Sequence, residues 1–372
     1  MKYRRLLFFY CLALGINVAM AQSADLPFAQ PVSFKYHLHE SVAGATLKKI
    51  AVDYNDIIYV LSDKGLLRLS EGELIKDNRY TPLQQKIPID IAVQEGEKNL
   101  YYLYSDKVLT NAHAGTFYAN LPSGKFSMLA VAADMSILLA GKKGVAFLKG
   151  KALTDIPAPA GKIISVYSSS GIFYLLTNEA LYKLSDNHFE KLHAGKDIKS
   201  VCFRNDEIIL ATSNGYYGIS SITADTTFPL QIKLPVTNID FLTTINNNIW
   251  AATSQGAFMH EPVGIYRYYA SQRWLIEDKV IEIASDSKAN AYMLTASGVS
   301  KVEFFYHTLA NKAQYFQDKI RQRHIRYGFI ANVTLEKAGD LSTARMTDTD
   351  NDGLWTAFYL GSQAFRYAVT KD

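Results

Sequence analysis

Three aspartates near the C-terminal end of the chain alternate with other residues just before a glycine: Asp348, Asp350 and Asp352, followed by Gly353. Carboxylates at every second position of a loop can surround Ca²⁺, a hard cation that prefers many oxygen ligands. The helix–loop–helix form of such a site needs a glutamate at its twelfth position, where this chain has Tyr359. The three aspartates are therefore candidate calcium ligands. The competing interpretation is that Asp352 caps the following helix and the other acids lie near its positive end.

A second group of candidate residues is basic or aromatic. Arg321, Arg323 and Arg326 follow one another closely, and arginine forks match carboxylates, so they could clamp an anionic ligand such as a uronic acid. The competing interpretation is a solvated cluster of favourable charge at a helix C-terminus. Trp274 is a further ligand-binding candidate because its ring could stack on a sugar, although such aromatics more often pack in a core.

No complete catalytic constellation is visible in the sequence. One cysteine, Cys202, remains beyond the N-terminal segment, in an apolar run that is typical of a buried strand. We expect an inert buried thiol there and no disulfide. The chain by itself is therefore expected to be non-catalytic.

Most of the chain before these C-terminal candidates is built from a repeated unit. An apolar strand, a polar turn, a second apolar strand, Ser/Thr-x-x-Gly and a third strand recur seven times, with glycine or its equivalent at 65, 108, 144, 180, 215, 256 and 298. A period near 40 with several short strands per unit is typical of a β-propeller. The glycine is expected to take positive φ in the turn between the second and third strands. Residues 33–40 alternate like a strand, and we expect them to pair into the last blade and close the ring.

One repeat carries a family resemblance. Residues 246–258, NNNIWAATSQGAF, resemble the blade core of the two-component-regulator propeller repeat, and residues 268–286 resemble the approach to a blade in that family. The likeness covers roughly residues 33–304, and several copies replace the tryptophan of the repeat with Tyr, Leu or Ile. The resemblance implies a seven-bladed unit that binds a ligand, often a glycan. It supplies no fixed catalytic residues.

The periodicity changes after residue 304. Leu309, Phe316, Ile320 and Tyr327 fall at helical spacing, and Gly328 is expected to stop the helix. A short strand is predicted over 329–337 and a second helix from Leu354. The segment from Arg323 onward resembles the opening of an α/α-toroid, the helical-hairpin barrel of many polysaccharide-active enzymes. Because that family's later helices are not in this sequence, the resemblance transfers no catalytic roles.

The N-terminus indicates export. Lys2, Arg4 and Arg5 precede an apolar stretch and the small-x-small site Ala19-Met20-Ala21, which predicts a cleaved signal peptide over 1–21 and a periplasmic or secreted protein. The whole sequence has 39 basic and 35 acidic residues; without the three basic residues of the signal it has 36 and 35. A net charge of +1 excludes a nucleic-acid footprint, and no stretch predicts stable membrane insertion.

The sequence therefore predicts an all-β fold: a seven-bladed β-propeller over 22–304, followed by a short α-helical segment over 305–372. The expected function is that of an exported ligand-binding or sensor-like propeller that recognises a glycan or an exported partner protein. No cofactor other than calcium is suggested. The alternative is the N-terminal accessory part of a polysaccharide-active enzyme with an α/α-toroid catalytic domain.

Overall fold

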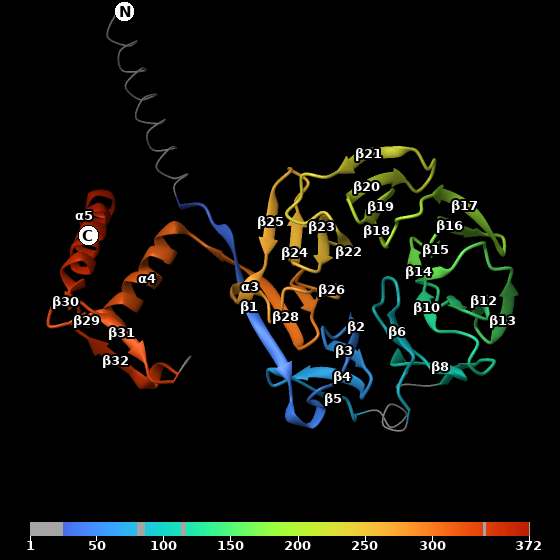
Figure 1. The fold of residues 1–372 in the computed structure, drawn as a ribbon, viewed down its shortest axis with the longest axis horizontal. Coiled ribbons are helices and arrows are strands. Elements are labelled where there is room, and N and C mark those ends of the chain that lie inside the picture. The colour runs from blue at the N-terminus through green and yellow to red at the C-terminus, as the bar shows by residue number, and fades with distance from the viewer. Residues whose placement is uncertain (1–24, 80–85, 113–116, 338–339, 372) are drawn as a thin grey trace, which may run out of the picture. The chain divides into compact units, whose positions relative to one another are not determined.

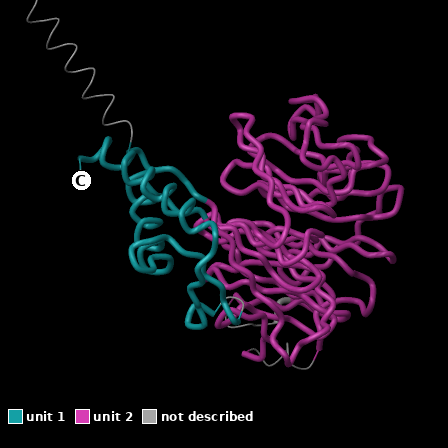
Figure 2. Tube along the Cα trace, turned by 60° about the vertical axis from the view of Figure 1, so that its left-hand side comes forward, with its two compact units in different colours: residues 1–30, 304–372 teal, residues 31–303 magenta. Residues whose placement is uncertain are grey.

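The computed structural model describes residues 25–79, 86–112, 117–337 and 340–371. The predicted signal peptide, residues 1–21, lies outside them. The chain divides into two compact units: Pro31–Glu303, and Met1–Gln30 together with Phe304–Asp372 (Figure 2). In the described part of the chain, no helix is both long and apolar enough to span a bilayer.

Within the described residues, the larger unit is a ring of seven four-stranded antiparallel blades (Figure 1), so the predicted seven-bladed propeller is confirmed. Blade 1 comprises β2 (Leu47–Val52), β3 (Ile58–Ser62), β4 (Gly65–Ser70) and β5 (Glu73–Lys76). Blade 2 comprises β6 (Asp90–Val93), β7 (Leu100–Leu103), β8 (Lys107–Thr110) and β9 (Phe117–Asn120). Blade 3 comprises β10 (Met128–Val131), β11 (Ile137–Gly141), β12 (Gly144–Lys149) and β13 (Ala152–Ile156).

The ring continues through four more blades. Blade 4 comprises β14 (Ile163–Ser169), β15 (Ile172–Thr177), β16 (Ala180–Ser185) and β17 (His188–Ala194). Blade 5 comprises β18 (Ser200–Arg204), β19 (Glu207–Thr212), β20 (Gly215–Ser220) and β21 (Thr226–Gln231). Blade 6 comprises β22 (Ile239–Ile245), β23 (Asn248–Thr253), β24 (Gly256–His260) and β25 (Tyr266–Tyr269), followed by the short helix α3 (Ser271–Trp274). Blade 7 comprises β26 (Glu282–Ser285), β27 (Ala291–Leu294), β28 (Gly298–His307) and β1 (Phe28–Leu38).

The first strands of the blades are innermost, because consecutive ones contact each other around the ring: β2 with β6, β6 with β10, β10 with β14, β18 with β22, and β22 with β26. Side chains on one first strand accept hydrogen bonds from backbone amides of the next. Glu282 Oε2 accepts from Ile50 N at 2.7 Å, and Ser200 Oγ accepts from Leu242 N at 3.1 Å. These bonds satisfy donors that no neighbouring strand can reach.

In the recurring Ser/Thr-x-x-Gly pattern, the hydroxyl side chain stabilises the turn between the second and third strands by hydrogen bonds to its backbone. Thr253 Oγ1 donates to Gly256 O at 2.7 Å and accepts from Gln255 N at 3.1 Å. Ser62 and Gly65 repeat the arrangement in blade 1. The expected positive φ is present, at 119° for Gly65 and 123° for Gly256.

The predicted repeat position is wrong by one residue in blade 2. Tyr104 N donates to Lys107 O, so Lys107 rather than Val108 corresponds to the glycine of the other blades. Tyr104 and Lys107 stand where most other blades have Ser/Thr and Gly, and Ser105 lies one residue later, so the sequence alone did not fix the register of this turn.

The predicted closing strand is confirmed. β1 lies between β28 of blade 7 and β5 of blade 1, and it pairs with β5 in parallel through His37–Glu73 and Leu38–Leu74. The first and last blades thereby form one continuous eight-stranded sheet. The ring is closed by the N-terminal strand and the last blade together, so neither blade leaves an unpaired edge at the junction.

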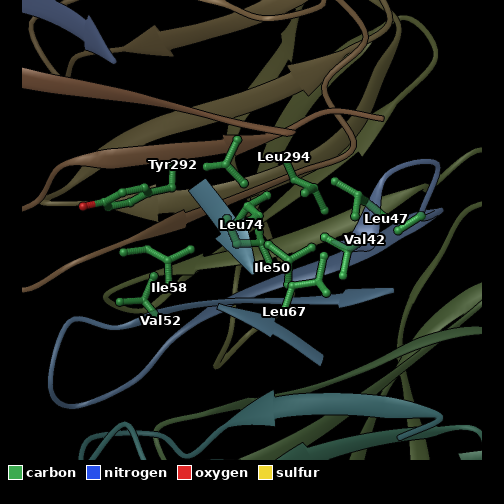
Figure 3. Packing of buried hydrophobic residues seen from close by; sticks show 12 residues of the cluster. Val42, Leu47, Ile50, Val52, Ile58, Leu67, Leu74, Tyr292 and Leu294 are labelled. Atoms are coloured by element: carbon green, nitrogen blue, oxygen red, sulfur yellow. The ribbon is translucent and has the colours of Figure 1, made fainter. Parts of the chain in front are cut away.

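The junction also has its own hydrophobic core (Figure 3). Leu67 and Leu74 from blade 1 pack with Leu294 from blade 7, and all three have 0% exposure. Val42, in the 3₁₀ turn η2 (Glu40–Val42), belongs to the same cluster. Similar clusters lie between other pairs of neighbouring blades, so the core consists of successive interblade layers.

The smaller unit contains the two predicted helices, α4 (Leu309–His324) and α5 (Asp352–Thr370). Gln317 of α4 donates to the Tyr359 hydroxyl of α5 at 2.9 Å. Between the helices lie the hairpins β29 (Ile325–Arg326) with β30 (Phe329–Ile330) and β31 (Asn332–Leu335) with β32 (Ala344–Thr347), and the turn η4 (Leu341–Thr343).

The predicted end of the first helix is wrong. α4 stops at His324, and Tyr327-Gly328, with φ of 50° and 85°, form the tight turn of a hairpin instead. Apolar residues at helical spacing continue past the end because Ile325 and Tyr327 belong to this hairpin.

Candidate functional site

The turns that join the first and second strands of the blades emerge on one face of the ring, which we call the inner-turn face. Because the first strands are innermost, these turns gather around one mouth of the central channel. On this face a hollow of about 460 Å³ is lined by residues of blades 2, 6 and 7, which we call the bowl. Its lining comprises Lys98, Thr244, Ile245, Asn246, Ser285, Asp286, Ser287, Lys288 and Ala289.

Asp286 builds the blade 7 wall of the bowl. It is buried, with 7% exposure, and one carboxylate oxygen accepts from the backbone amides of Lys288 and Asn290 at 3.0 and 2.9 Å. The other accepts from the Asn290 side chain at 2.7 Å and from the Tyr292 hydroxyl at 2.9 Å. Both carboxylate oxygens are thus used in hydrogen bonds that stabilise the turn. The turn in this conformation places Ser287 and Lys288 on the lining of the bowl.

Further carboxylates tie the inner turns of different blades together. Asp56 of blade 1 accepts from Ser287 N at 2.7 Å and from the Ser287 hydroxyl. Glu95 of blade 2 accepts from Ser168 Oγ at 2.9 Å and Gly171 N at 3.1 Å, in blade 4. Hydrogen bonds therefore hold the turns around the mouth in fixed positions. Such preorganisation lowers the entropic cost of binding a ligand.

The charges around the bowl are balanced. Lys98 and Lys288 are on its lining, and among the described residues neither forms an ion pair. Hydrogen bonds from Ser287, aided by the charges of Lys98 and Lys288, lower the pKa of Asp56, which therefore stays ionised. The remaining polar lining consists of hydroxyl and amide groups from Thr244, Asn246 and the serines. Such a surface suits a polar, hydrogen-bonding ligand of low net charge.

Trp274, a predicted ligand-binding residue, does not join this surface. It lies in α3, between the last strand of blade 6 and the first of blade 7, and such connections emerge on the opposite face from the inner turns. Its ring packs edge-to-face on Tyr269 at 5.2 Å, and its carbonyl accepts from Ser33 Oγ of β1 at 2.6 Å. These contacts hold α3 against blade 6 and the closing strand.

One arginine and one aspartate that were predicted for separate roles form an ion pair with each other. Arg326 Nη1 lies 2.7 Å from Asp348 Oδ1 in an exposed ion pair. The hydrogen bond between them raises the pKa of Arg326 and lowers the pKa of Asp348, so both groups stay charged. Arg321 and Arg323 lie in the last turn of α4, where positive charge complements the helix dipole. A role for the three arginines in binding a ligand stays a prediction.

The three aspartates do not converge on one point. Asp348 faces Arg326, and one oxygen of Asp352 accepts from Thr349 Oγ1 at 3.0 Å. No group of three or more His, Cys, Asp or Glu side chains that could hold a metal occurs in the described ranges. In this arrangement Asp348, Asp350 and Asp352 do not fit a calcium ion. The interpretation of Asp352 as the N-cap is wrong by one residue: Asn351 holds the N-cap position, without a side-chain hydrogen bond, and Asp352 is the first helical residue, with its acidic group in the first turn.

Cys202 matches its prediction. The thiol is free and buried on β18, and burial raises its pKa to about 12. A thiol that stays protonated is a poor nucleophile and a poor metal ligand.

Sequence reasoning missed the bowl residues, because most of them are ordinary polar residues in turns or at strand ends. A signal existed: Asp53 and Asp286 hold equivalent turns in blades 1 and 7, each accepting from amides two and four residues ahead. Aligning the repeats on these aspartates would have identified the inner turns.

Comparison with known proteins supports the fold. No family model matches the chain, and no curated protein matches it either. Among solved structures, the extracellular domain of BT4673 from B. thetaiotaomicron, described as a hybrid two-component system, is similar with a TM-score of 0.57 and 15% identity over 74% of this chain. The extracellular domain of BT3049 from the same organism gives 0.53 and 14% over 69%.

This chain spans 39% and 40% of the length of those two sensor domains. Virginiamycin B lyase from Staphylococcus aureus is also similar, with a TM-score of 0.58 and 9% identity over 75% of this chain and 100% of the lyase. At such identities the similarity is one of fold. The predicted resemblance to sensor-type propellers is confirmed at that level.

Proposed function

We propose that this protein is an exported, sensor-like propeller that binds a glycan on its inner-turn face. The observation that carries the proposal is the bowl, a concave surface at the channel mouth that is lined by hydroxyl, amide and ammonium groups. Glycans present many hydroxyls that donate and accept hydrogen bonds, and a set of fixed polar groups in a hollow provides both orientation and specificity.

A glycan fits this lining better than a protein partner does. Protein interfaces depend on buried aromatic and arginine anchors, which the bowl lining does not contain. Small polar side chains and two lysines offer instead many weak contacts to a hydroxyl-rich molecule.

Two further observations support export and a sensor-like role. The N-terminal residues have the pattern of a signal peptide. The similar propellers of BT4673 and BT3049 are extracellular domains of proteins described as two-component systems. In that role, ligand binding to the propeller would be read by another part of a signalling system.

The proposal is tested by isothermal titration of the purified chain with a panel of oligosaccharides, using wild type and Asn246→Gly. Asn246 lies in a two-residue turn with φ of 49°, so glycine removes the bowl amide without straining the backbone. Asn187→Gly is the matched control, because Asn187 has φ of 63° in the exposed β16–β17 turn, outside the bowl. Weaker binding by Asn246→Gly alone supports the proposal, whereas saturable binding of a partner protein without any glycan binding overturns it.

One observation favours the alternative of an accessory part of a polysaccharide-active enzyme. No side chain of α5 is buried, and the apolar residues Leu354, Phe358 and Phe365 have 50%, 67% and 78% exposure. A helix with this surface suits packing in a larger helical domain. The intact mass of the native exported protein and an assay for polysaccharide turnover test this alternative. A mass well above that of the chain after residue 21, together with turnover, would favour the enzyme.

A further inference from the structure

A second hollow opens between blades 5 and 6, with a volume of about 410 Å³. We call it the interblade pocket. Its size falls within the range of roughly 300–1,000 Å³ that is common for small-molecule sites. Its lining comprises Arg204, Asn205, Tyr216, Phe228, Gln231, Asn247, Ile249, His260 and Pro262.

The interblade pocket and the bowl share one turn. Asn246 and Asn247 are the two residues between β22 and β23, with φ of 49° and 64°. Asn246 lines the bowl and Asn247 lines the interblade pocket. The two hollows are therefore neighbours on the inner-turn face, separated by the width of a tight hairpin turn. A ligand made of linked units could occupy both.

The deep wall of the interblade pocket is aromatic and fixed in place. Tyr216 has 0% exposure, and Phe228 packs edge-to-face on it with ring centres 6.0 Å apart. The hydroxyl of Tyr216 is hydrogen bonded to His260 Nδ1, and the imidazole lies flat on Tyr266 with ring centres 4.1 Å apart. Burial raises the pKa of Tyr216, so the phenol keeps its proton, and its oxygen also lies 3.5 Å from the Tyr266 hydroxyl.

His260 consequently has one ring nitrogen paired with Tyr216 and one that faces no protein partner among the described residues. Burial, aided by the positive charge of Arg204, lowers its pKa, so the ring is neutral. A neutral imidazole offers one N–H donor and one acceptor nitrogen, and Nδ1 uses one of these two functions with the Tyr216 hydroxyl. Among the described residues, Nε2 has no protein partner, so it is free for a ligand hydroxyl, which can both donate and accept a hydrogen bond.

The interblade pocket carries no net charge. Glu207 Oε2 accepts from Arg204 Nη2 at 2.7 Å and from Arg204 Nε at 3.1 Å. The carboxylate thereby neutralises the guanidinium charge, and Nη1 remains as a hydrogen-bond donor. Asn205 and Asn247 add exposed amides at the rim, and Phe228 offers an apolar ring surface. Planar polar groups beside an apolar ring suit a sugar residue, which has hydroxyls at its edge and C–H groups on its face.

We propose that the interblade pocket is a subsite for a neutral sugar residue of a glycan whose adjoining units lie in the bowl. This inference rests on the proposed function. An acidic sugar is disfavoured because the only guanidinium in the lining is already paired with Glu207, so a carboxylate would be buried there without a free countercharge.

The test is isothermal titration of the full chain with two sets of probes: neutral pentasaccharides (cellopentaose, xylopentaose, mannopentaose and maltopentaose) and acidic oligosaccharides (tetragalacturonate and a heparin tetrasaccharide). Wild type is compared with Asn246→Gly, Asn247→Gly and Asn187→Gly, which all keep a positive-φ turn. Loss of one hydrogen bond corresponds to roughly a fivefold loss of affinity. The proposal expects a neutral pentasaccharide to bind and each of Asn246→Gly and Asn247→Gly to weaken it by about that factor, with Asn187→Gly unchanged.

The other outcomes separate the two proposals. Two outcomes would leave the proposed function standing and overturn the neutral subsite. In the first, a neutral glycan binds and only Asn246→Gly weakens its binding. In the second, an acidic oligosaccharide binds and the neutral ones do not. Binding of none of the probes would overturn both.

Discussion

The hydroxyl of Tyr216 in blade 5 and the imidazole of His260 in blade 6 share a hydrogen bond across the gap between the two blades. The bond joins two repeats that also meet through an apolar cluster and through the hydrogen bond from Leu242 N to Ser200 Oγ. It is also the deep wall of the interblade pocket. One contact therefore contributes to both the packing of the ring and the proposed recognition of a ligand.

This pair predicts a pH-dependent contribution to stability. Because the folded-state pKa of His260 is lowered, its contribution is present above the unfolded value of 6.5 and is lost as pH falls through the folded pKa. His260→Phe keeps a ring against Tyr266 but leaves the Tyr216 hydroxyl without its hydrogen bond to the imidazole. We expect it to lower the free energy of unfolding by about 1–3 kcal/mol at pH 7.5, and by less at pH 5.

Urea unfolding of wild type and His260→Phe between pH 5 and pH 8 measures the difference. His188→Phe is the control, because His188 is an exposed histidine beside Glu190 at 3.1 Å. Parallel stability curves for wild type and His260→Phe would contradict the assignment.

A second pH effect has the opposite sign. Glu282 lies on the channel wall, and burial raises its pKa to about 7, against the attraction of Lys49. Its contribution to stability is therefore full below the unfolded value of 4.5 and is lost as pH rises through about 7. Glu282→Gln keeps an acceptor for the Ile50 amide and cannot ionise. It should raise the free energy of unfolding by about 1–3 kcal/mol at pH 8 and leave it nearly unchanged at pH 4.

Denaturant titrations at the two pH values decide this prediction, with Glu97→Gln as an exposed control. If Glu282→Gln were less stable than wild type at pH 8, the ionised carboxylate would be stabilising and the prediction would be wrong.

The closing strand predicts a third effect. A Cβ atom at Gly298 would lie 2.3 Å from the carbonyl oxygen of Tyr36 in β1, and Gly298 has φ of 156°. Gly298→Ala must therefore displace the strand that closes the ring, and we expect a loss of at least about 2 kcal/mol in the free energy of unfolding. Gly264→Ala is the control, because it has φ of 85° but no atom within 4 Å of the added carbon. Equal losses in the two variants would show that the close approach of β1 does not matter.

A fourth prediction concerns calcium. Since Asp348 is paired with Arg326 and Asp352 with Thr349, removing divalent cations should leave the C-terminal segment unchanged. The melting temperature of the chain should be the same in EDTA as in calcium. A decrease in EDTA that calcium restores, and that Asp350→Asn abolishes, would show that the loop rearranges to bind the ion.

The fold could be predicted from the sequence because each blade repeats a local physical requirement. Ser62 with Gly65 and Thr253 with Gly256 lock the same turn, so their spacing is visible without a structure. Where that lock is missing, as between Tyr104 and Lys107, the predicted register was wrong. The end of α4 was wrong for a related reason, since apolar spacing alone does not reveal the turn at Tyr327-Gly328.

The site could not be predicted in the same way. Tyr216 and His260 lie 44 residues apart in the sequence and meet only because blades 5 and 6 are neighbours in the ring. Each lies in or beside an ordinary strand, where local pattern gives no sign of a pocket. Conversely, the sharpest local motif, Asp348 to Asp352, has carboxylates that the fold directs to different partners. The candidate site residues of this propeller lie where blades adjoin. Which residues meet there depends on the order of the blades in the ring.

The central claim is that the inner-turn face is the ligand-binding surface. Hydrogen exchange measured by mass spectrometry, with and without a saturating pentasaccharide from the titration panel, tests it most directly. Our account predicts protection in the β22–β23 and β26–β27 turns, residues 244–249 and 285–290, and none in the turns of the opposite face at residues 253–256 and 295–298. Protection confined to the opposite face, or to the C-terminal unit, would contradict it.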